Sequence, residues 1–388
     1  MRVVIAPDKF KGSLSAPDVA KHLATGLLAG FGHGIEATRI PVADGGEGTI
    51  DAAIGSGFTR RTTTVTGPLG EPVKADFAVR DQEAVIEMAA ASRLALLPDG
   101  PTSETAKTAT SIGTGELIRA ALDLGCRKII LGVGGSANTD AGAGVLQGLG
   151  AVFLDENGNE LPGGGAALAQ LNSIDFSNFD VRVEATEFVL ASDVDNPLLG
   201  ASGAPAIFGP QKGATPDDVT SLDAALSHFV DVLSATTGQH AKFAAKAEGA
   251  GAAGGVGYIA IAALKAERRP GIDVVLEFTE LEQRLKGADL VITGEGSLDE
   301  QSLLGKTPMG VSRAAQRNGV PVIAVCGRST LSREQLTDAG FHTVHALTDL
   351  EKDVQKCIAE AGPLLEQLGK HIGVYLAERT ENKEYLNV

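Results

Sequence analysis

The chain has 388 residues, of which 43% are hydrophobic and 21% are charged, and this composition excludes a disordered or fibrous protein. At about 150 residues per domain, the length predicts two or three domains. The 49 acidic and 33 basic side chains give a formal net charge of −16, which disfavours nucleic acid and anionic membranes as partners.

The three cysteines, Cys126, Cys326 and Cys357, are far apart in the sequence and form no C-x-x-C pair, which is typical of a reducing compartment. The first residues, MRVVIAPDKF, do not have the pattern of a signal peptide. The longest uncharged stretch, residues 249–264, has 16 residues, fewer than the roughly 18 that suggest a membrane span. We therefore expect a soluble, cytoplasmic protein, and leave open whether it forms a homodimer.

Short runs of β-branched residues alternate with helical patterns, which predicts an α/β protein with a largely parallel sheet. The segment 60–88 differs, because it alternates and turns like antiparallel strands. We predict strands at residues 2–6, 39–42, 63–65, 73–79, 84–86, 128–132, 188–191, 289–293, 320–325 and 343–346. Capping residues predict helices that begin near Ser15, Thr215 and Thr307.

These patterns predict two α/β domains. Residues 1–56 and 287–388 are expected to form a discontinuous Rossmann-like domain, and residues 57–286 an inserted mixed α/β domain with glycine-rich loops. The 49 glycines make up about 13% of the chain, nearly twice the usual share of about 7%. Because they follow no fixed period, we expect them in turns and at close backbone approaches to a ligand.

The first polar loop, APDKFKGSLSA, places Asp8, Lys9, Lys11 and Ser13 between the first strand and the first helix. Two lysines beside a helix N-terminus can form a local anion site in an otherwise acidic chain. The alternative is a run of charges that is merely solvated.

The second loop, PVADGGEGT, carries Asp44 and Glu47 at the start of a helix. Two carboxylates three residues apart could hold Mg²⁺, directly or through water. They could equally do no more than interact favourably with the helix dipole.

The third loop follows a buried strand in the segment RKIILGVGGSANTDAGAG. Backbone N–H groups of such a loop can hold phosphate, because glycine lets a ligand approach without a side-chain clash. The candidate contacts are Gly134, Gly135, Ser136, Asn138 and Thr139. The spacing Gly132-x-Gly134-x-x-Ala137, with Asp155 further on, also meets a relaxed dinucleotide fingerprint. A tight strand-to-helix turn without a ligand remains the alternative.

Asp193 and Asp195 follow the strand expected at 188–191, and active-site groups of open α/β sheets gather at the carboxyl ends of strands. These acids could supply a general base, a Mg²⁺ ligand or both, and alternation along an extended chain would point them the same way. Gln211 and Lys212 lie in the next Gly/Pro turn, either as phosphate contacts or as an ordinary surface turn.

The segment ITGEGSLDEQSLLGKTPMGV contains Gly305-Lys306-Thr307, but position 300 is Glu, so it is not a Walker A motif. A lysine at a helix N-terminus still favours an anion, and Glu295 adds metal-binding capacity. A solvated surface lysine is the alternative.

Taken together, these segments resemble the bacterial glycerate kinase family of the type that makes 2-phosphoglycerate. The similar segments are residues 6–16, 41–49, 132–144, 193–213, 249–257 and 292–311, in the same order along the chain. Two positions depart from the family pattern. Asn138-Thr139 stands where many relatives have Thr-Asn, and Ser297 stands where many have Arg.

The resemblance implies transfer of the γ-phosphoryl group of ATP to a hydroxyl of D-glycerate with Mg²⁺, in a cleft between two α/β domains. On this basis we expect Asp193, Lys306 and Lys11 to be catalytic and Asp8, Lys9, Ser13, Gln211 and Lys212 to bind substrate. Nucleotide or phosphate contacts are expected from Gly134, Gly135, Ser136, Asn138, Thr139, Gly294, Gly296 and Thr307, and metal contacts from Asp44, Glu47, Asp195 and Glu295.

Two other functions remain open from the residues alone. An NAD-dependent dehydrogenase of a small hydroxy acid would use Gly132–Ala137 and Asp155. A non-enzymatic binding protein of two α/β lobes would bind ligands without turnover, but it would leave the many loop carboxylates unexplained.

Overall fold

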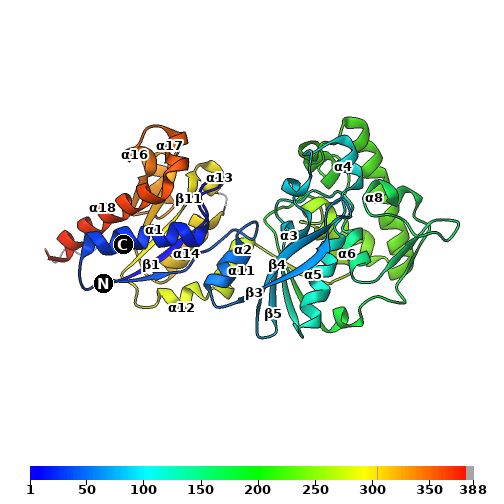
Figure 1. The fold of residues 1–388 in the computed structure, drawn as a ribbon, viewed down its shortest axis with the longest axis horizontal. Helices are drawn as coiled ribbons and strands as arrows, with labels where there is room; N and C mark the ends of the chain where they lie inside the picture. The colour runs from blue at the N-terminus through cyan, green and yellow to red at the C-terminus, as the bar shows by residue number, and fades with distance from the viewer. Residues whose placement is uncertain (304, 382–388) are drawn as a thin grey trace. The chain divides into compact units, whose positions relative to one another are not determined.

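The computed structural model describes residues 1–303 and 305–381, and within them the chain divides into two compact units. The first unit contains Met1–Asp44, Asp51–Gly57 and the chain from Ile272 onward. The second contains Gly45–Ile50 and Phe58–Gly271. Both are built from sheets and helices, so the predicted α/β class is confirmed (Figure 1).

The first unit is built on a parallel five-stranded sheet with the strand order β13-β12-β11-β1-β2. Its strands are β1 (Arg2–Pro7), β2 (Glu36–Arg39), β11 (Leu290–Leu298), β12 (Val322–Ser329) and β13 (Thr343–Ala346). Its helices are α1 (Ala16–Phe31), α2 (Thr49–Gly55), α11 (Gly271–Phe278), α12 (Leu281–Leu285), α13 (Glu300–Leu303), α14 (Thr307–Arg317), α15 (Arg333–Asp338), α16 (Leu347–Leu350), α17 (Val354–Ala359) and α18 (Ala361–Glu381). The first residues of α2 and α11 belong to the second unit.

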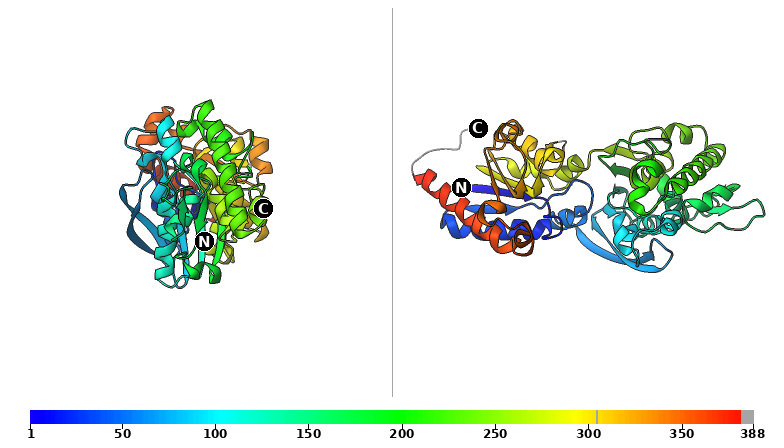
Figure 2. Two further views of the ribbon diagram at one scale, coloured as in Figure 1. Left: turned by 90° about the vertical axis from the view of Figure 1, so that its right-hand side faces the viewer. Right: turned by 90° about the horizontal axis from the view of Figure 1, so that it is seen from above.

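Helices α1 and α18, from opposite ends of the chain, lie side by side on one face of this sheet (Figures 1 and 2). Val3 and Ile5 of β1 share a core with both helices. Because side chains alternate along a strand, the residues between them face the other side of the sheet, and α14 contacts β1, β11 and β12. Ser15 caps α1 by accepting a hydrogen bond from the backbone of Asp18, as predicted.

The second unit contains a mixed six-stranded sheet with the order β10-β9-β6-β5-β4-β3 and a two-stranded sheet of β7 and β8. Its strands are β3 (Thr59–Thr66), β4 (Pro72–Arg80), β5 (Glu83–Glu87), β6 (Lys128–Gly132), β7 (Val152–Leu154), β8 (Ser173–Asp175), β9 (Glu187–Ala191) and β10 (Glu267–Arg269). Strands β5, β6, β9 and β10 are parallel, whereas β3 and β4 extend the sheet in antiparallel fashion. The antiparallel character expected for residues 60–88 is therefore confirmed.

The helices of this unit surround its large apolar core. They are α3 (Ala89–Ser92), α4 (Ser103–Thr108), α5 (Ile112–Asp123), α6 (Ala143–Gly148), α7 (Ala204–Phe208), α8 (Pro216–Thr237), α9 (His240–Ala244) and α10 (Val256–Ala262). Short 3₁₀ helices occupy Leu94–Leu96, Ala166–Gln170, Val181–Ala185, Pro210–Lys212 and Ala252–Gly255. Thr215 caps the start of α8, as predicted, and it also forms a capping box with Asp218.

The strand predicted at 39–42 was placed too late in the chain, because β2 ends at Arg39. The next residues still run beside β1, since the N–H groups of Ile40 and Val42 donate to the carbonyls of Ile5 and Pro7. Pro41 lies between them and has no N–H to donate, which interrupts the regular hydrogen-bond ladder.

Candidate functional site

Asp8 directly follows β1, and Glu295 lies within β11 three residues before its end, so the two acids are neighbours toward one edge of the sheet in the first unit. Parallel pairing sets Pro7 opposite Gly294, and the N–H of Asp8 donates to the Gly294 carbonyl at 2.8 Å. The acids that directly follow this pair are therefore neighbours. This edge is where parallel α/β sheets commonly bind ligands.

Asp8 is only 6% exposed and is held from two sides. Its Oδ1 accepts the N–H of Lys9 at 2.6 Å, and its Oδ2 accepts the hydroxyl of Thr307 at 2.5 Å. Burial raises the pKa of Asp8 to about 6, the Lys9 ammonium lowers it in part, and the nearby negative charge of Asp44 raises it again. Asp8 can therefore exchange a proton near neutral pH.

Glu295 is the second acid of this edge. Burial raises its pKa to about 7, with further increases from the charges of Asp8 and Asp299 and a decrease from the ammonium of Lys306. Its Oε1 is buried and has no hydrogen-bond partner among the described residues. A buried oxygen of this kind is costly unless a proton, a cation or a ligand satisfies it.

Lys306 and Thr307 open helix α14 beside these acids. Lys306 is itself the N-cap residue. Thr307 is the first and Pro308 the second residue of this 11-residue helix. The unpaired N–H groups of this terminus and the lysine ammonium together favour an anion. The structure thus brings predicted phosphate and acid groups together.

Other predicted residues of the first unit have mainly structural contacts. The hydroxyl of Ser13 donates to the carbonyl of Ile358 at 2.6 Å, which ties the first loop to α17. Gly294 lies so close to the Val325 carbonyl that a side chain there would collide with it, and Gly296 faces the backbone of Phe10 and Lys11. Lys11 is exposed.

Arg328 lies next to Ser297, the position where the resemblance led us to expect arginine. The two residues are opposite one another on β11 and β12, and the Arg328 Nε lies 3.4 Å from the Ser297 hydroxyl. A cation is therefore present at this place although it comes from the neighbouring strand.

In the second unit, two of the predicted phosphate-loop glycines make room for another loop. A side chain on Gly132 would place its Cβ 2.6 Å from the carbonyl oxygen of Gly45, and one on Gly134 would come within 3.0 Å of the Cα of Gly46. Close backbone packing thus explains Gly132 and Gly134.

Glu87, at the end of β5, fixes this second loop. Its Oε1 accepts the N–H groups of Gly48 at 3.0 Å and Ile50 at 2.7 Å, at the start of α2. Glu87 is 8% exposed. The sequence analysis missed it, although an acid at the carboxyl end of a buried strand is a recognisable signal. It holds the loop that carries Asp44 and Glu47.

Below the exposed tip of the third loop, the polar side chains are buried. Asn138, Thr139 and Asp140 are fully buried, and Ser136 is 7% exposed. Asp140 accepts hydrogen bonds from the backbone and hydroxyl of Ser111, the amide of Asn138 and the backbone of Gly142 and Gly144. A nucleotide could contact Asn138 or Thr139 only if the loop opened.

Lys212, expected to bind substrate or else to lie in a surface turn, is also buried, with 2% exposure. Its ammonium donates to the Ser136 hydroxyl at 2.8 Å and to the Asn138 carbonyl. The neighbouring Gln211 is exposed. Burial lowers the pKa of Lys212 to about 7, an effect that the Asp140 charge partly opposes.

Asp193 and Asp195 are both exposed after β9, but they have different partners. Asp193 accepts the N–H of Gly271, the first residue of α11, at 3.0 Å. Asp195 forms an ion pair with Arg268, which also contacts Glu248. The Arg268 pair neutralises Asp195 without a metal ion.

Among residues 1–303 and 305–381, no three His, Cys, Asp or Glu side chains converge as a metal cage. In the same part of the chain, none of the helices has both the length and the apolar character needed to cross a bilayer.

The dehydrogenase hypothesis has no support in the structure. Asp155 lies in an exposed turn after β7, where it accepts hydrogen bonds from Asn157 and Asn159. Gly132 and Gly134 contact the second loop, as described above.

Comparison with known proteins agrees with the resemblance of the motifs. Residues 3–377 match the model of the glycerate kinase family. The glycerate kinase of Bacillus subtilis (strain 168) is 43% identical over 96% of this chain and 97% of its own. The glycerate 2-kinase of Escherichia coli (strain K12) is 45% identical over 85% of this chain and 86% of its own.

A crystal structure of a glycerate kinase 2 candidate from Salmonella typhimurium LT2 is similar in fold. It matches with a TM-score of 0.83 at 39% identity and covers 98% of this chain and 99% of that one. Family model, relatives and fold agree over nearly the whole length. The chain belongs to the glycerate kinase family.

Proposed function

We propose that this protein transfers the γ-phosphoryl group of ATP to a hydroxyl of D-glycerate, giving ADP and phosphoglycerate, with 2-phosphoglycerate favoured over 3-phosphoglycerate. Family membership and relatives named as glycerate kinases support this reaction. The observation that carries it is the juxtaposition of Lys306 and the α14 N-terminus with two acids of raised pKa, Asp8 and Glu295.

Phosphoryl transfer asks a protein mainly to position two substrates and to neutralise charge on the moving group. Lys306 and the first N–H groups of α14, with Thr307, would hold phosphate oxygens. Lys9 and Lys11 would bind the glycerate carboxylate, since both follow β1 beside Asp8. The exposed tip of the third loop, Gly134–Gly135, would contact the nucleotide phosphates.

A carboxylate must also orient the attacking hydroxyl and accept its proton. Asp193 is the candidate from the sequence, at the end of β9. Asp8 is a second candidate on a separate observation, because it is buried, hydrogen-bonded to Thr307 and has a pKa of about 6. Substitution of each acid by asparagine distinguishes them.

Mg²⁺ fits the donor chemistry of the first unit. The orphaned Oε1 of Glu295 and the carboxylates of Asp8 and Asp44 are oxygen ligands of the type Mg²⁺ prefers. Mg²⁺ commonly binds through one or two carboxylates together with substrate phosphates, so a protein-only cage is not required. When bound with ATP, it would neutralise charge on the phosphate oxygens.

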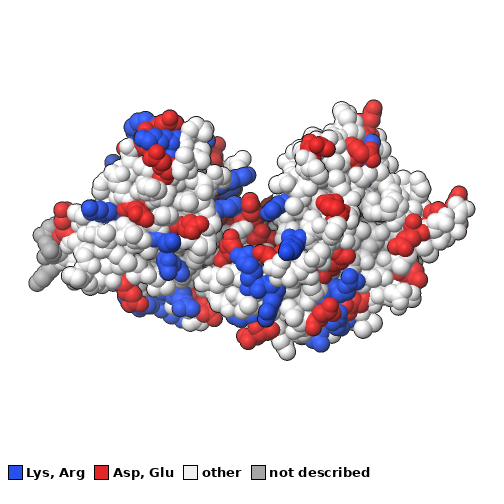
Figure 3. All heavy atoms as spheres, viewed as in Figure 1, with Lys and Arg blue, Asp and Glu red and all other residues white. Residues whose placement is uncertain are grey.

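We also propose that the protein works in the cytoplasm. Cys126, Cys326 and Cys357 are all buried free thiols, which suits a reducing compartment. Acidic and basic side chains are interspersed on the face shown in Figure 3. With a net charge of −16, this surface does not favour nucleic acid.

The test is a coupled assay of ADP release from ATP with D-glycerate and Mg²⁺. We expect ADP only when glycerate is present, loss of turnover in excess EDTA, and a phosphorus NMR spectrum of 2-phosphoglycerate. Lactate, which lacks the 3-hydroxyl, and 3-hydroxypropionate, which lacks the 2-hydroxyl, are matched controls for the acceptor. Equal ADP release without any acceptor, or full activity in EDTA, would contradict the proposal.

A further inference from the structure

Lys212 is a polar amine in a place where a hydrophobic residue often costs no more. It lies in the short 3₁₀ helix Pro210–Lys212 and is 2% exposed. Burying an ammonium requires several compensating interactions, and an apolar residue of similar volume is often at least as stable. The hydrogen bonds of its amine are therefore the feature that an apolar residue at this position could not replace.

The contacts all lie in the third loop. The Lys212 ammonium donates to the hydroxyl of Ser136 at 2.8 Å and to the carbonyl of Asn138. It therefore connects two points of the same turn, on either side of Ala137, whose N–H donates to the carbonyl of Ser92. This turn cannot move without breaking both hydrogen bonds to the buried Lys212 amine.

Asp140 holds the loop where it enters α6. Its carboxylate accepts from the N–H groups of Gly142 and Gly144 and from the backbone and hydroxyl of Ser111, in front of α5. It also accepts from the side-chain amide of Asn138 at 2.8 Å. Lys212 and Asp140 thus both bind Asn138, Lys212 through the backbone carbonyl and Asp140 through the side-chain amide.

The part of the loop that faces solvent comes immediately before the residues that Lys212 and Asp140 bind. Gly135 is exposed, and Gly134 is partly exposed. Gly135 has a φ of +72°, and a Cβ built on it would meet nothing closer than the side chain of Ala89 at 3.8 Å. Gly135 therefore has open space beside it and a backbone conformation that glycine adopts without strain, whereas Gly134 packs against Gly46 of the second loop.

We propose that Lys212 is a positioning residue, which fixes the Ser136–Asn138 turn from beneath so that the Gly134–Gly135 tip is rigid when the phosphates of ATP bind. Lys212 does not touch the substrate in this arrangement. The inference rests on the proposed function of this loop. Its physical basis is that a preorganised loop does not lose conformational freedom when its ligand binds.

The test compares Lys212→Met, which keeps the length of the side chain without its charge or donors, with the wild-type protein. We expect KM for ATP to rise about tenfold or more, since both hydrogen bonds that fix the loop are lost, with a smaller change in KM for glycerate. The dissociation constant of ATP, measured by calorimetry, should rise by a similar factor.

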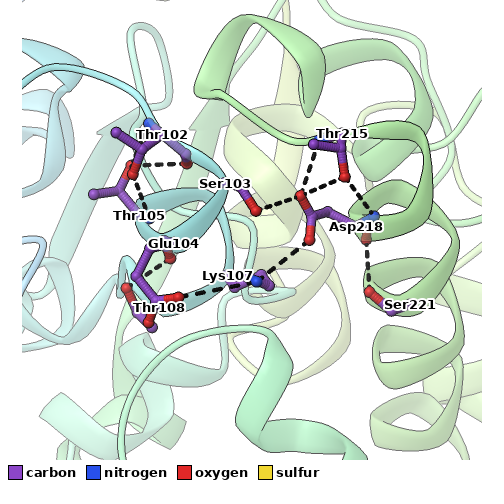
Figure 4. A network of polar contacts seen from close by, with 9 residues as sticks. All are labelled: Thr102, Ser103, Glu104, Thr105, Lys107, Thr108, Thr215, Asp218 and Ser221. Atoms are coloured by element: carbon purple, nitrogen blue, oxygen red, sulfur yellow. Dashed lines mark hydrogen bonds and ion pairs between the residues drawn. The ribbon is translucent and has the colours of Figure 1, made fainter.

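A matched control comes from another buried charge of the same unit (Figure 4). Asp218 accepts hydrogen bonds from Ser103 and Thr215 and contacts Lys107, and it is 7% exposed. It follows Lys212 by six residues but touches none of the residues 134–140 in these contacts. We expect Asp218→Asn to lower the unfolding temperature, because hydrogen bonds to a buried carboxylate are weakened. KM for ATP should stay within about twofold, because these hydrogen bonds do not involve the third loop.

A double-mutant cycle keeps the proposal testable if Lys212→Met does not fold. Lys212→Gln retains a neutral donor, and Ser136→Ala removes one of the two acceptors. Because both act on one contact, their effects on the dissociation constant of ATP should not add. Additive effects, or an unchanged affinity for ATP in both Lys212 variants, would overturn the proposal.

Failure of the proposed function would look different. A wild-type protein that binds ATP but does not phosphorylate glycerate would contradict the reaction, while the calorimetric comparison would still decide the role of Lys212. A rise confined to KM for glycerate would overturn the assignment of this loop to ATP.

Discussion

Replacing Asp8 by asparagine should make the protein more stable and less active. The carboxylate is 6% exposed, and burial raises its pKa from 3.8 to about 6. Such a shift means that ionised Asp8 destabilises the folded state by about 3 kcal/mol well above pH 6. Asparagine has no charge, keeps an oxygen for the N–H of Lys9 and can donate to the Thr307 hydroxyl, so its gain is not offset by lost contacts.

The sign of the pH dependence follows from the raised pKa. Between pH 3.8 and about 6 the folded protein binds more protons at Asp8 than the unfolded chain does, so ionisation costs stability as the pH rises through this window. The advantage of Asp8→Asn should be close to zero below pH 4, about 1.5 kcal/mol at pH 5 and about 3 kcal/mol at pH 8. Activity should fall about 10²-fold or more if Asp8 orients the hydroxyl.

The assay is urea unfolding of both proteins at pH 5 and pH 8, with kinetics measured on the same samples. Glu351→Gln, in the same unit, is a control whose effect on stability should have the opposite sign. Hydrogen bonds from Lys356 and from the backbone of Asp353 lower the pKa of Glu351, so its substitution should destabilise more at pH 8 than at low pH. An Asp8→Asn protein less stable than wild type at pH 8, or an advantage that shrinks as the pH rises, would refute the reasoning.

Three further predictions concern the same loops. Lys306→Ala should lower kcat/KM by roughly 10²-fold with an unchanged unfolding temperature, and an effect below threefold in steady-state kinetics would remove Lys306 from the site. Asp193→Asn should leave ATP binding intact and cut kcat by roughly 10²–10⁴-fold, because asparagine still accepts the Gly271 N–H but takes no proton; a near-normal kcat would exclude Asp193 as the base. Gly132→Ala places a Cβ 2.6 Å from the Gly45 carbonyl and should lower the unfolding temperature by several degrees, whereas an unchanged thermal melt would show that the second loop can move aside.

Local signals in the sequence were enough for much of the fold. Strand β6 begins and ends at the predicted residues 128 and 132, because a short apolar run is bounded by a lysine and a glycine. The N-cap at Thr215 was recognisable for the same reason, since the proline and the two acids that mark the first turn follow it directly in the sequence. Strand β2 was misplaced because its own residues are polar and only the buried run after it carries an apolar signal.

The sequence could not predict which polar residues of the site loops are buried. Lys212 lies in a Gly/Pro turn that is usually exposed, and its acceptors, Ser136 and Asn138, are more than 70 residues away. Glu87 stands 37 and 39 residues from the N–H groups that it binds. Contacts of this kind depend on tertiary packing, and so does the neighbourhood of Asp8 and Glu295, which the pairing of β1 with β11 creates.

The position of β1 in its sheet has a consequence for synthesis on the ribosome. This strand lies between β11 and β2, and the Thr293 hydroxyl bonds the carbonyl of Ala6 across 287 residues of sequence. At 5–20 residues per second, roughly 15–60 s pass before β11 emerges, while the chain of the second unit is already complete. During this interval one edge of the apolar strand β1 has no partner, so we expect nascent β1 to be open to non-native pairing.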